Sequence, residues 1–499
     1  MSDSPYLIAL DQGTTSSRTI VFNKSGQKIV AIQREFTQHY PQSGWVEHDA
    51  TEIWESQLWT LQQAIEKLGD RAEFIAAIGI TNQRETLVVW DRTTGEPVAP
   101  AIVWQDRRTA DDCAAWENDG WGSEVSRRTG LRLDPYFTGT KLAWLLRNTE
   151  GLKQRARQGE IIAGTVDSWL IWKLTGGKVH ATDCSNASRT LLFNLESGSW
   201  DPDLLNLFEV PVDMLPEIRD SAGNFGTVAA TFPGRGIPIR GVAGDQQAAL
   251  FGQGCTESGM VKNTYGTGCF LLMQTGEKPV RSSHDLLTTV AWRIRGQTSF
   301  ALEGAVFVAG AAVQWARDEL QLVKSAEELS SLAASVPDAN GVICVPAFTG
   351  LGAPHWDPYA RGTLMGLTRG AGRAHICRAI LESIALQSCD LIDAMEKDSG
   401  LTLSEIRVDG GATASEPLMQ IQANLAGKAV IRPAELETTA WGAAKLAGLG
   451  AGVWKNLAEM QQTQEADQRF SPQSGFDPGP IKKRWGRAVA LSKGWIESA

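Results

Sequence analysis

Near its start the chain reads Tyr6-Leu7-Ile8-Ala9-Leu10-Asp11-Gln12-Gly13-Thr14-Thr15-Ser16-Ser17-Arg18 and continues Thr19-Ile20-Val21-Phe22. Two apolar runs flank a tip of one glycine and four small hydroxyl residues, a pattern that predicts a β-hairpin. Successive backbone N–H groups in such a tip form an anion-binding concavity, and the hydroxyls of Thr14, Thr15 and Ser16 add donors. The pattern predicts either a phosphate-binding turn or a plain glycine-centred hairpin without a ligand.

Two charged side chains beside the tip favour the phosphate-binding alternative. Arg18 can place a positive charge against phosphate. Asp11 would repel a bare phosphate, so its presence favours a cation such as Mg²⁺ between the two groups. The turn is not a Walker-type P-loop, because the two Gly-Lys pairs of the chain are followed by Val179 and Ala429 rather than Ser or Thr.

The composition is that of a folded protein without membrane spans. A length of 499 residues predicts two large domains or about three smaller ones. A hydrophobic content of 42% with 21% charged residues is typical of globular chains. The net charge of −10 argues against a broad nucleic-acid footprint, which needs a basic surface. The longest apolar stretch, near 304–313, is about half the ~20 residues of a membrane span, and no signal peptide is expected.

Cysteine and histidine placement points to a reducing compartment and to no metal site built from these residues. The seven cysteines are scattered and never form CxxC, which favours free thiols in the cytoplasm over a thiolate zinc site. The six histidines form no pair at helical spacing. We therefore expect a cytoplasmic protein without a histidine or thiolate metal centre.

A second hairpin of the same kind follows about 250 residues later. Gly259-Met260-Val261-Lys262-Asn263-Thr264-Tyr265-Gly266-Thr267-Gly268 runs into Cys269-Phe270-Leu271-Leu272-Met273, which is a strand, a Gly/Thr tip and a returning strand. The two hairpins predict a duplicated α/β domain with facing phosphate loops, although chance could also produce such a pair. The expected boundary near 251–254 gives an N-terminal domain of residues 1–252 and a C-terminal domain of residues 253–499.

Periodicity and turn residues predict further elements. The segment 50–68 is an amphipathic helix that Asp49 or Thr51 can cap, and 74–81 is a buried strand. The other expected elements are strands at 86–90, 101–104, 237–244, 342–348 and 406–409. Helices are expected at 136–148, within 301–318 after Glu303-Gly304, and at 373–396, 417–425 and 441–449. The segment 223–236 is expected to be a surface loop.

Polar residues follow several of these strands, where open α/β sheets place their ligands. Asp245 could cap a short helix at 246–251 or act as a general base that accepts a proton from an attacking hydroxyl. Arg84 and Glu85 form either a surface ion pair or a clamp for the hydroxyls of a small polyol. Trp104, Tyr136 and Phe270 are core aromatics or, together, a wall against the carbon face of a substrate.

Two longer patterns match a known family residue by residue. They are Tyr136-Phe137-Thr138-Gly139-Thr140-Lys141-Leu142-Ala143-Trp144-Leu145-Leu146-Arg147-Asn148, and Gly362-Thr363-Leu364-Met365-Gly366-Leu367 with His375-Ile376 and Ala379-Ile380-Leu381-Glu382. From residue 5 to about 450, the chain resembles the FGGY carbohydrate kinases, which share the ribonuclease H-like, actin-type ATPase fold. Its markers DQGTTSSR, NQRET, WQDRRT, GDQQAALFGQ and FTGLGAPHWD are similar to those of the members that phosphorylate glycerol.

The resemblance implies two α/β domains of that fold closing on an interdomain cleft, with ATP and Mg²⁺ as cofactors. It implies transfer of a phosphoryl group from ATP to glycerol, giving sn-glycerol 3-phosphate as the first step of glycerol catabolism, in a homodimer or homotetramer. The implied acceptor site is Arg84, Glu85, Tyr136, Asp245 and Gln246, with Trp104 and Phe270 against the carbons and Asp245 as the base. The implied nucleotide site is Thr14, Thr15, Ser16, Arg18, Thr267, Gly310, Gln314, Gly411 and Ser415, with Asp11 and Asp245 toward the metal.

Alternatives of two kinds stay open. A sibling kinase could act on a pentulose or on gluconate, although the Arg84-Glu85 pair and Trp104 favour a smaller triol. An ATP-gated binding or chaperone module on the same fold would need no base beside a polyol pocket.

The chain departs from the family pattern at two places. It has Ser415-Glu416 where the family commonly has an Asn pair near the adenine, which predicts looser purine recognition. The loop 233–236 lacks the Gly-Thr-Arg order linked to sugar-phosphate inhibition in some relatives. This predicts weak or absent inhibition by fructose bisphosphate.

Overall fold

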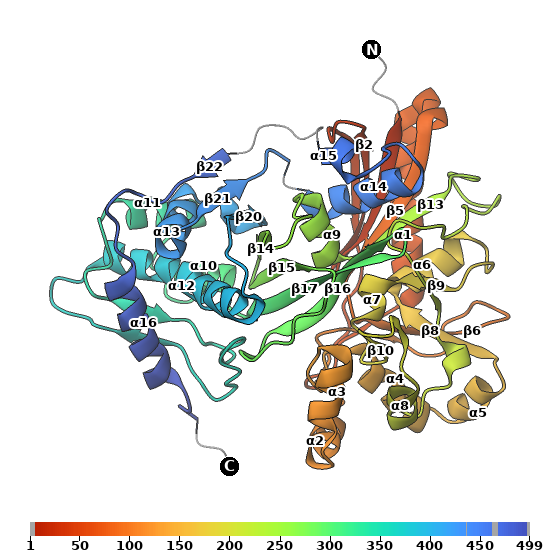
Figure 1. The fold of residues 1–499 in the computed structure, drawn as a ribbon, viewed down its shortest axis with the longest axis horizontal. Helices are drawn as coiled ribbons and strands as arrows, with labels where there is room; N and C mark the ends of the chain where they lie inside the picture. Colours follow the sequence, from red (N-terminus) through yellow and green to blue (C-terminus); the bar gives the residue numbers. More distant parts are fainter. Residues whose placement is uncertain (1–4, 436, 462–467, 497–499) are drawn as a thin grey trace.

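Two mixed β-sheets form the framework of the chain (Figure 1). The computed structural model describes residues 5–435, 437–461 and 468–496. The five-stranded sheet has the order β13-β5-β1-β2-β3, with β1 (Tyr6–Gln12), β2 (Ser16–Asn23), β3 (Lys28–Glu35), β5 (Ile75–Asn82) and β13 (Ile239–Gly244). The seven-stranded sheet has the order β16-β17-β15-β14-β20-β21-β22, with β14 (Val261–Tyr265), β15 (Cys269–Gly276), β16 (Leu287–Ile294), β17 (Gln297–Val306), β20 (Glu405–Asp409), β21 (Ala429–Arg432) and β22 (Gln468–Phe470).

The two sheets repeat one arrangement. In the first, the antiparallel hairpin β1–β2 is continued on one side by β3 and on the other by the parallel strands β5 and β13. In the second, the antiparallel hairpin β14–β15 is continued by β17 on one side and by the parallel strands β20 and β21 on the other. The shared order confirms the predicted duplication of an α/β unit.

Short strands and helices complete the chain. A third sheet of four strands has the order β4-β7-β6-β8, with β4 (Glu47–His48), β6 (Leu87–Asp91), β7 (Ala101–Ile102) and β8 (Ile161–Thr165). Three two-stranded pairs join β9 (Ala181–Asp183) to β12 (Glu217–Arg219), β10 (Phe193–Asn194) to β11 (Ser199–Trp200), and β18 (Ile343–Val345) to β19 (Thr363–Met365). The helices of the first half are α1 (Ala50–Leu68), α2 (Ala110–Asn118), α3 (Trp121–Thr129), α4 (Thr138–Asn148), α5 (Leu152–Arg157), α6 (Val166–Leu174), α7 (Cys184–Ala187), α8 (Pro202–Leu207) and α9 (Asp245–Gly252). Those of the second half are α10 (Gly310–Asp318), α11 (Ala326–Ala334), α12 (Arg373–Ser399), α13 (Glu416–Ala426), α14 (Thr438–Gly450), α15 (Leu457–Gln461) and α16 (Gly479–Ser492).

Helix α14 comes from the far end of the chain but packs on the first sheet, against β1, β5 and β13, and on α9. Glycines make this close approach possible. A Cβ on Gly442 of α14 would lie 1.8 Å from the carbonyl oxygen of Ala248 in α9, and a Cβ on Gly252 would lie 1.9 Å from that of Thr438. Any larger residue at these two positions would push the helices apart, so both must be glycine for this packing to form.

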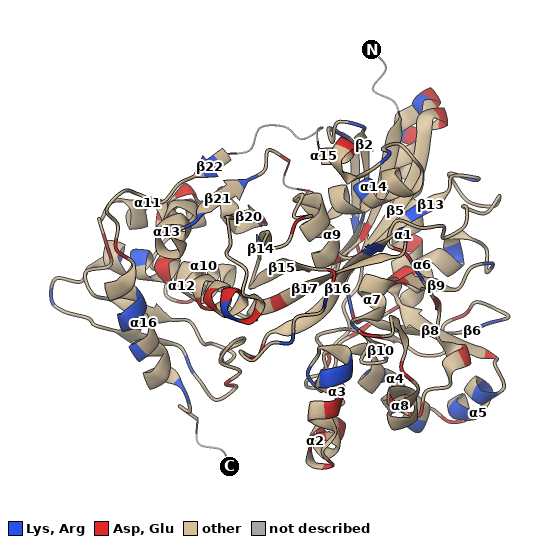
Figure 2. Ribbon diagram, in the orientation of Figure 1, with Lys and Arg blue, Asp and Glu red and all other residues tan. Residues whose placement is uncertain are grey.

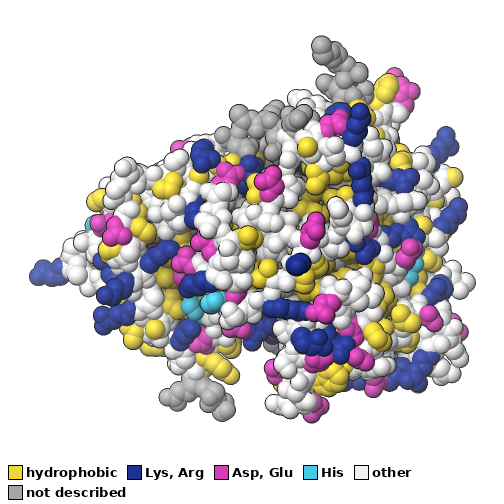
Figure 3. All heavy atoms as spheres, in the orientation of Figure 1, with side chains coloured by type: hydrophobic (Ala, Val, Ile, Leu, Met, Phe, Trp, Pro, Cys, Tyr) yellow, Lys and Arg dark blue, Asp and Glu magenta, His cyan; other side chains and the backbone are white. Residues whose placement is uncertain are grey.

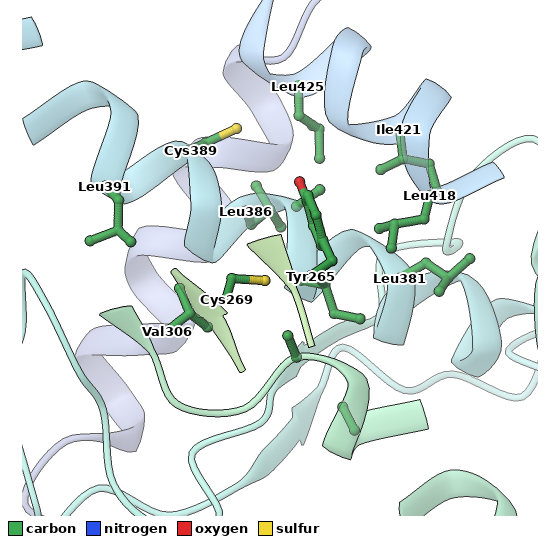
Figure 4. Packing of buried hydrophobic residues seen from close by; sticks show 14 of the residues in the cluster. Tyr265, Cys269, Val306, Leu381, Leu386, Cys389, Leu391, Leu418, Ile421 and Leu425 are labelled. Carbon is green, nitrogen blue, oxygen red and sulfur yellow. The ribbon is translucent and has the colours of Figure 1, made fainter. Parts of the chain in front are cut away.

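The second hairpin stands on an apolar core. Tyr265, at the end of β14, is buried among Leu381 and Leu386 of α12 and Leu418 of α13, as Figure 4 shows. Its hydroxyl donates to Oε1 of Gln422 at 2.7 Å, so the buried phenol is satisfied. The core therefore fixes the strand that leads into the Gly266–Gly268 tip.

Most predicted elements are confirmed within a few residues. The helix expected at 50–68 is α1, and Asp49 is its cap, because its carboxylate accepts from the Thr51 N–H at 2.7 Å. The segment 223–236 contains no helix or strand. The helix predicted within 301–318, after Glu303-Gly304, is wrong in its first residues. Residues up to Val306 belong to β17, which pairs with β15 and β16, and the helix begins at Gly310.

Charged groups of both signs are distributed over both halves (Figure 2). On the face shown in Figure 3, basic and acidic side chains are interspersed. No helix within the described residues is long and apolar enough to cross a membrane. The seven cysteines are all free, as the sequence predicts, and all are buried.

Candidate active site

The first hairpin tip carries an ion pair at its base. Asp11 and Arg18 are paired in the β1–β2 register, and the Arg18 guanidinium donates to the Asp11 carboxylate. A second Arg18 nitrogen donates to Oε2 of Glu437 at 2.8 Å. Burial raises the pKa of Asp11 from its usual value, against the opposing effect of Arg18. At the tip itself, Thr15 is exposed and Thr14 and Ser16 are half-buried, so they remain accessible to a ligand.

Thr14 links this tip to the aromatic residues predicted from the sequence. The indole Nε1 of Trp104 donates to Thr14 Oγ1 at 3.0 Å. The Trp104 ring meets the Tyr136 ring edge to face, with centroids 5.7 Å apart. Both aromatics are half-buried, which leaves part of each ring open as a wall. Phe270 is on β15, where it pairs with Ala305 of β17, and is half-buried; within the described residues no ring contact joins it to Trp104 or Tyr136.

Arg84 connects the predicted base to the second sheet. Its Nε lies 3.2 Å from Oδ1 of Asp245. Its two terminal nitrogens donate to the two carboxylate oxygens of Glu303 on β17, at 2.6 and 2.9 Å. Such a fork-to-fork arrangement fixes the plane of the guanidinium. Arg84 therefore presents a defined edge to Asp245.

Glu85 is held by a second arginine. Arg189 Nε donates to Oε1 of Glu85 at 2.6 Å, and another Arg189 nitrogen donates to Glu303 at 3.1 Å. The Glu85 backbone has φ +60°, an uncommon left-handed conformation for a non-glycine residue. Its carbonyl accepts from Thr138 at 3.1 Å and from the buried Lys141 ammonium at 3.3 Å. Lys141 also donates to the Tyr136 carbonyl, so one cation ties two predicted acceptor-site residues together.

Asp245 is the first residue of α9, directly after β13, and its carboxylate accepts from the Gln246 N–H at 2.7 Å. Its side chain is 33% exposed, whereas those of Arg84 and Glu85 are buried. Burial raises the pKa of Asp245 above its usual value. The positive charges of Arg84 and Lys262 lower this pKa, and the negative charge of Asp11 raises it further, but burial has the largest effect. The carboxylate is therefore reachable and more basic than a free aspartate, which suits a general base.

The Gln246 side chain contacts a buried lysine. Lys262 Nζ donates to Gln246 Oε1 and, at 2.9 Å, to Thr264 Oγ1. Burial lowers the pKa of Lys262 to about 8, although the Asp409 and Asp245 carboxylates favour its charged form. A positive charge thus lies behind Asp245, on the strand that leads into the second hairpin tip.

The second hairpin tip packs against the start of α10. The Gly310 N–H donates to the Gly266 carbonyl at 3.0 Å, and the Ala309 N–H donates to the Thr267 carbonyl at 2.8 Å. A Cβ on Gly310 would lie 2.5 Å from the Gly266 oxygen, so this contact requires glycine. Thr267 is exposed at the tip, as is Gln314 one helical turn after Gly310.

The turn after β20 lies beside the same hairpin. Gly410 has φ +89°, and a Cβ there would meet the Tyr265 oxygen at 2.4 Å. The next residue, Gly411, is exposed with open space around it. Ser415 is engaged differently: its hydroxyl lies 2.8 Å from that of Ser330 and caps α13 by accepting from the Leu418 N–H at 3.3 Å.

Adjacent residues at the start of α14 connect the two hairpins. Glu437 pairs with Arg18 of the first hairpin. Thr438 donates to the carboxylate of Asp409, which ends β20 beside β14 of the second hairpin. The start of α14 therefore contacts the base of the first hairpin through Glu437 and the strand next to the second hairpin through Thr438.

Asp11 and Asp245, the two carboxylates expected toward the metal, can be compared with what a Mg²⁺ ion requires. Within the described residues, no group of three or more His, Cys, Asp or Glu side chains could hold a metal ion by itself. Mg²⁺, however, usually takes one or two carboxylates and completes its shell with waters and substrate phosphates. Asp11 and Asp245 supply two carboxylates of this kind, at the end of β1 and at the start of α9.

Three charged residues of the site do not follow from the sequence patterns: Glu303, Arg189 and Lys262. Each is buried and paired with groups far away along the chain. A charged residue inside an otherwise apolar strand, such as Glu303 between Leu302 and Gly304 in β17, is the one signal that could have marked them.

Comparison with known proteins identifies the family. The models of the N-terminal and C-terminal domains of the FGGY family of carbohydrate kinases match residues 6–252 and 261–451. Over 493 residues the chain is 57% identical to glycerol kinase of Trichlorobacter lovleyi, covering 99% of each chain. It is 53% identical over 500 residues to that of Deinococcus radiodurans, covering 100% of each chain.

Solved structures agree with this result. A crystal structure of Plasmodium falciparum glycerol kinase with ADP superposes with a TM-score of 0.94 at 34% identity, covering 98% of each chain. A ligand-bound xylulose kinase from Lactobacillus acidophilus shares the fold, with a TM-score of 0.88 at 23% identity, covering 98% of this chain and 99% of that one. The chain is therefore a two-domain α/β kinase that belongs to the FGGY family of carbohydrate kinases.

Proposed function

We propose that this chain is a cytoplasmic kinase that transfers the γ-phosphoryl group of ATP to glycerol and yields sn-glycerol 3-phosphate, the first step of glycerol catabolism. The single observation that carries the proposal is the placement of a reachable, basic carboxylate, Asp245, against Arg84 beside the Trp104–Tyr136 wall. The full-length identity to glycerol kinases supports the same acceptor.

The charges of the pocket favour a neutral acceptor. Arg84 and Arg189 are each paired with Glu85 or Glu303, so these two arginines are already engaged by carboxylates of the chain rather than held ready for the carboxylate of gluconate. A triol has hydroxyls that both donate and accept, which suits an arginine and a carboxylate side by side. This supports glycerol over gluconate among the acceptors of the family.

The proposed chemistry needs few groups. Asp245 accepts the proton of the terminal hydroxyl as that oxygen attacks the γ-phosphorus, while Arg84 and Glu85 hold the hydroxyls and Trp104, Tyr136 and Phe270 bound the carbon face. Asp11 and Asp245 would hold Mg²⁺, which neutralises charge on the phosphate oxygens when bound. The halves close on both substrates, so that water is excluded and glycerol is the acceptor.

The nucleotide is proposed to lie between the two hairpin tips. Backbone N–H groups and hydroxyls of Thr14, Thr15, Ser16 and Thr267, with Arg18, would bind the phosphates. The segment around Gly310 and Gln314 and the turn at Gly411 would border the nucleoside, with Ser415 nearby. We further propose a homodimer or homotetramer of the 54.0 kDa chain, which light scattering can measure.

A coupled assay of ADP release tests the function. The purified chain is given Mg-ATP with glycerol, xylulose, gluconate or no acceptor. We expect turnover that depends on glycerol and is far slower with the other two compounds. Faster turnover with xylulose or gluconate would assign the chain to a sibling kinase, and equal ADP release without any acceptor would support an ATP-gated module.

A further inference from the structure

Four charged side chains form a closed, buried group that we call the charge quartet: Arg84, Glu85, Arg189 and Glu303. All four are at most 3% exposed. Glu303 accepts from both arginines, and Glu85 accepts from Arg189 at 2.6 Å and lies 3.8 Å from the Arg84 Nε. Two positive and two negative groups give the quartet a formal charge of zero. Only two of them, Arg84 and Glu85, were expected to touch the acceptor.

The other two members act on those acceptor-site residues. Glu303 engages both terminal nitrogens of Arg84, which leaves the Nε edge toward Asp245 at 3.2 Å. Arg189 holds the Glu85 carboxylate, and its guanidinium carbon lies 5.3 Å from the centroid of the Phe137 ring. The quartet joins three separate parts of the chain: the end of β5, the segment after α7, and β17 of the second sheet.

We propose that Glu303 and Arg189 are positioning residues that keep the charges of Arg84 and Glu85 balanced and thereby select uncharged polyols over carboxylate-bearing acceptors of the same size. This inference rests on the proposed acceptor function of Arg84 and Glu85. Removing one member leaves one uncompensated unit charge in a buried place. The sign of this remaining charge then decides whether a neutral or an anionic acceptor binds better.

The size of the effect follows from Coulomb's law. At an effective dielectric constant of ~20 and a separation of ~5 Å, one unit charge changes the affinity of an anionic ligand by roughly 10²-fold. To first order, the affinity of a neutral ligand of the same shape does not change with the net charge of the pocket. The ratio of the two affinities therefore isolates electrostatic selection from general damage to the pocket.

The test uses glycerol and glycerate, which differ by a carboxylate in place of one hydroxymethyl group. Dissociation constants for both are measured by calorimetry on the full chain and on Glu303→Gln, Arg189→Gln and the double variant. We expect Glu303→Gln to shift the glycerol-to-glycerate preference toward glycerate by about 10²-fold. Arg189→Gln should shift it the opposite way, and the double variant, neutral again, should return close to the wild-type ratio.

A matched control is Glu382→Gln on α12, because Glu382 is also buried and also paired with an arginine, Arg378 at 2.7 Å, outside the site. It should leave the ratio unchanged. Equal changes for both ligands in the Glu303 and Arg189 variants, or shifts of the same sign, would overturn the inference. Should Glu303→Gln not fold, the sign of the Arg189→Gln shift and the recovery in the double variant still decide it. Failure of the proposed function shows separately, as a wild-type chain that has no glycerol-dependent ADP release.

Discussion

Replacement of Asp245 by Asn tests the proposed base most directly. The amide keeps the shape of the side chain and can still accept from the Gln246 N–H at the start of α9. It cannot take up the proton of an attacking hydroxyl. It also removes the negative charge that faces the Arg84 Nε at 3.2 Å. The shape of the side chain is kept, while its acid–base function and its negative charge are lost.

The expected loss is a factor of about 10² to 10⁴ in kcat, the usual contribution of a positioned general base. A factor of about 10² corresponds to about 2.7 kcal/mol of transition-state stabilisation. Stability should not fall with it. Burial raises the pKa of Asp245 in the folded state above 3.8, so the folded chain binds more protons than the unfolded chain between these two pKa values. The ionised carboxylate therefore costs folding free energy at neutral pH, and the uncharged Asn removes that cost.

The assay is initial-rate kinetics with glycerol and Mg-ATP from acid to neutral pH, together with thermal unfolding. In the wild type, kcat/KM should fall as the pH drops through the pKa of Asp245, because the base becomes protonated. The variant should lack this acid limb and bind ATP nearly as well as the wild type. Asp203→Asn is the matched control, since Asp203 also lies in the first turn of a helix and pairs with an arginine, Arg128 at 2.8 Å. Near-wild-type turnover in Asp245→Asn would remove this residue from the mechanism.

Four further predictions concern packing, pH and regulation. Gly442→Ala should lower the free energy of unfolding in urea by about 2 kcal/mol, because the added methyl group would meet a carbonyl oxygen of α9 at 1.8 Å. The control Gly486→Ala, where the new methyl group has open space on α16, should not lower it. Burial lowers the pKa of Lys141 from 10.5 to about 7. Between these pH values the unfolded chain binds more protons at Lys141 than the folded chain, so the contribution of Lys141 to stability rises with pH. Lys141→Met should therefore gain less unfolding free energy from pH 7 to 10 than the wild type. Ser415→Asn, which can still cap α13, should increase the preference for ATP over GTP, and an unchanged ratio of kcat/KM values would contradict looser purine recognition. The loop 233–236 should give weak or no inhibition by fructose bisphosphate, and strong inhibition in a rate titration would refute this.

Much of the framework could be predicted because it rests on local chemistry. Each hairpin tip needs glycine and small hydroxyl residues at adjacent positions, and each buried parallel strand needs an unbroken apolar run. The position of Asp245 was predictable for the same reason, since it follows the apolar strand β13 and starts α9. The helix α1 shows both an apolar stripe and a capping carboxylate at Asp49 in the sequence itself.

The rest depends on partners that are distant along the chain. Residues 301–306, Ala-Leu-Glu-Gly-Ala-Val, have the composition of a helix, but pairing with β15 and β16 on both sides makes them a strand. The role of Glu303 follows only from this pairing, because it lies 219 residues from Arg84 in sequence. Arg189 likewise meets Glu85 across 104 residues. Buried ion pairs of this kind have no local pattern.

The hydrogen bond from the Trp104 indole to Thr14 has a thermodynamic consequence, because it can couple the affinities of two ligands. Since the indole fills an acceptor position of the Thr14 hydroxyl, the proton of that hydroxyl stays free to be donated onward. If the tip binds the nucleotide as proposed, we expect an acceptor that shifts Trp104 to alter the affinity of the tip for that nucleotide. Linkage then requires the nucleotide to change the affinity for the acceptor by the same factor as the acceptor changes the affinity for the nucleotide. We therefore expect the dissociation constants of the acceptor and the nucleotide to change by one common factor.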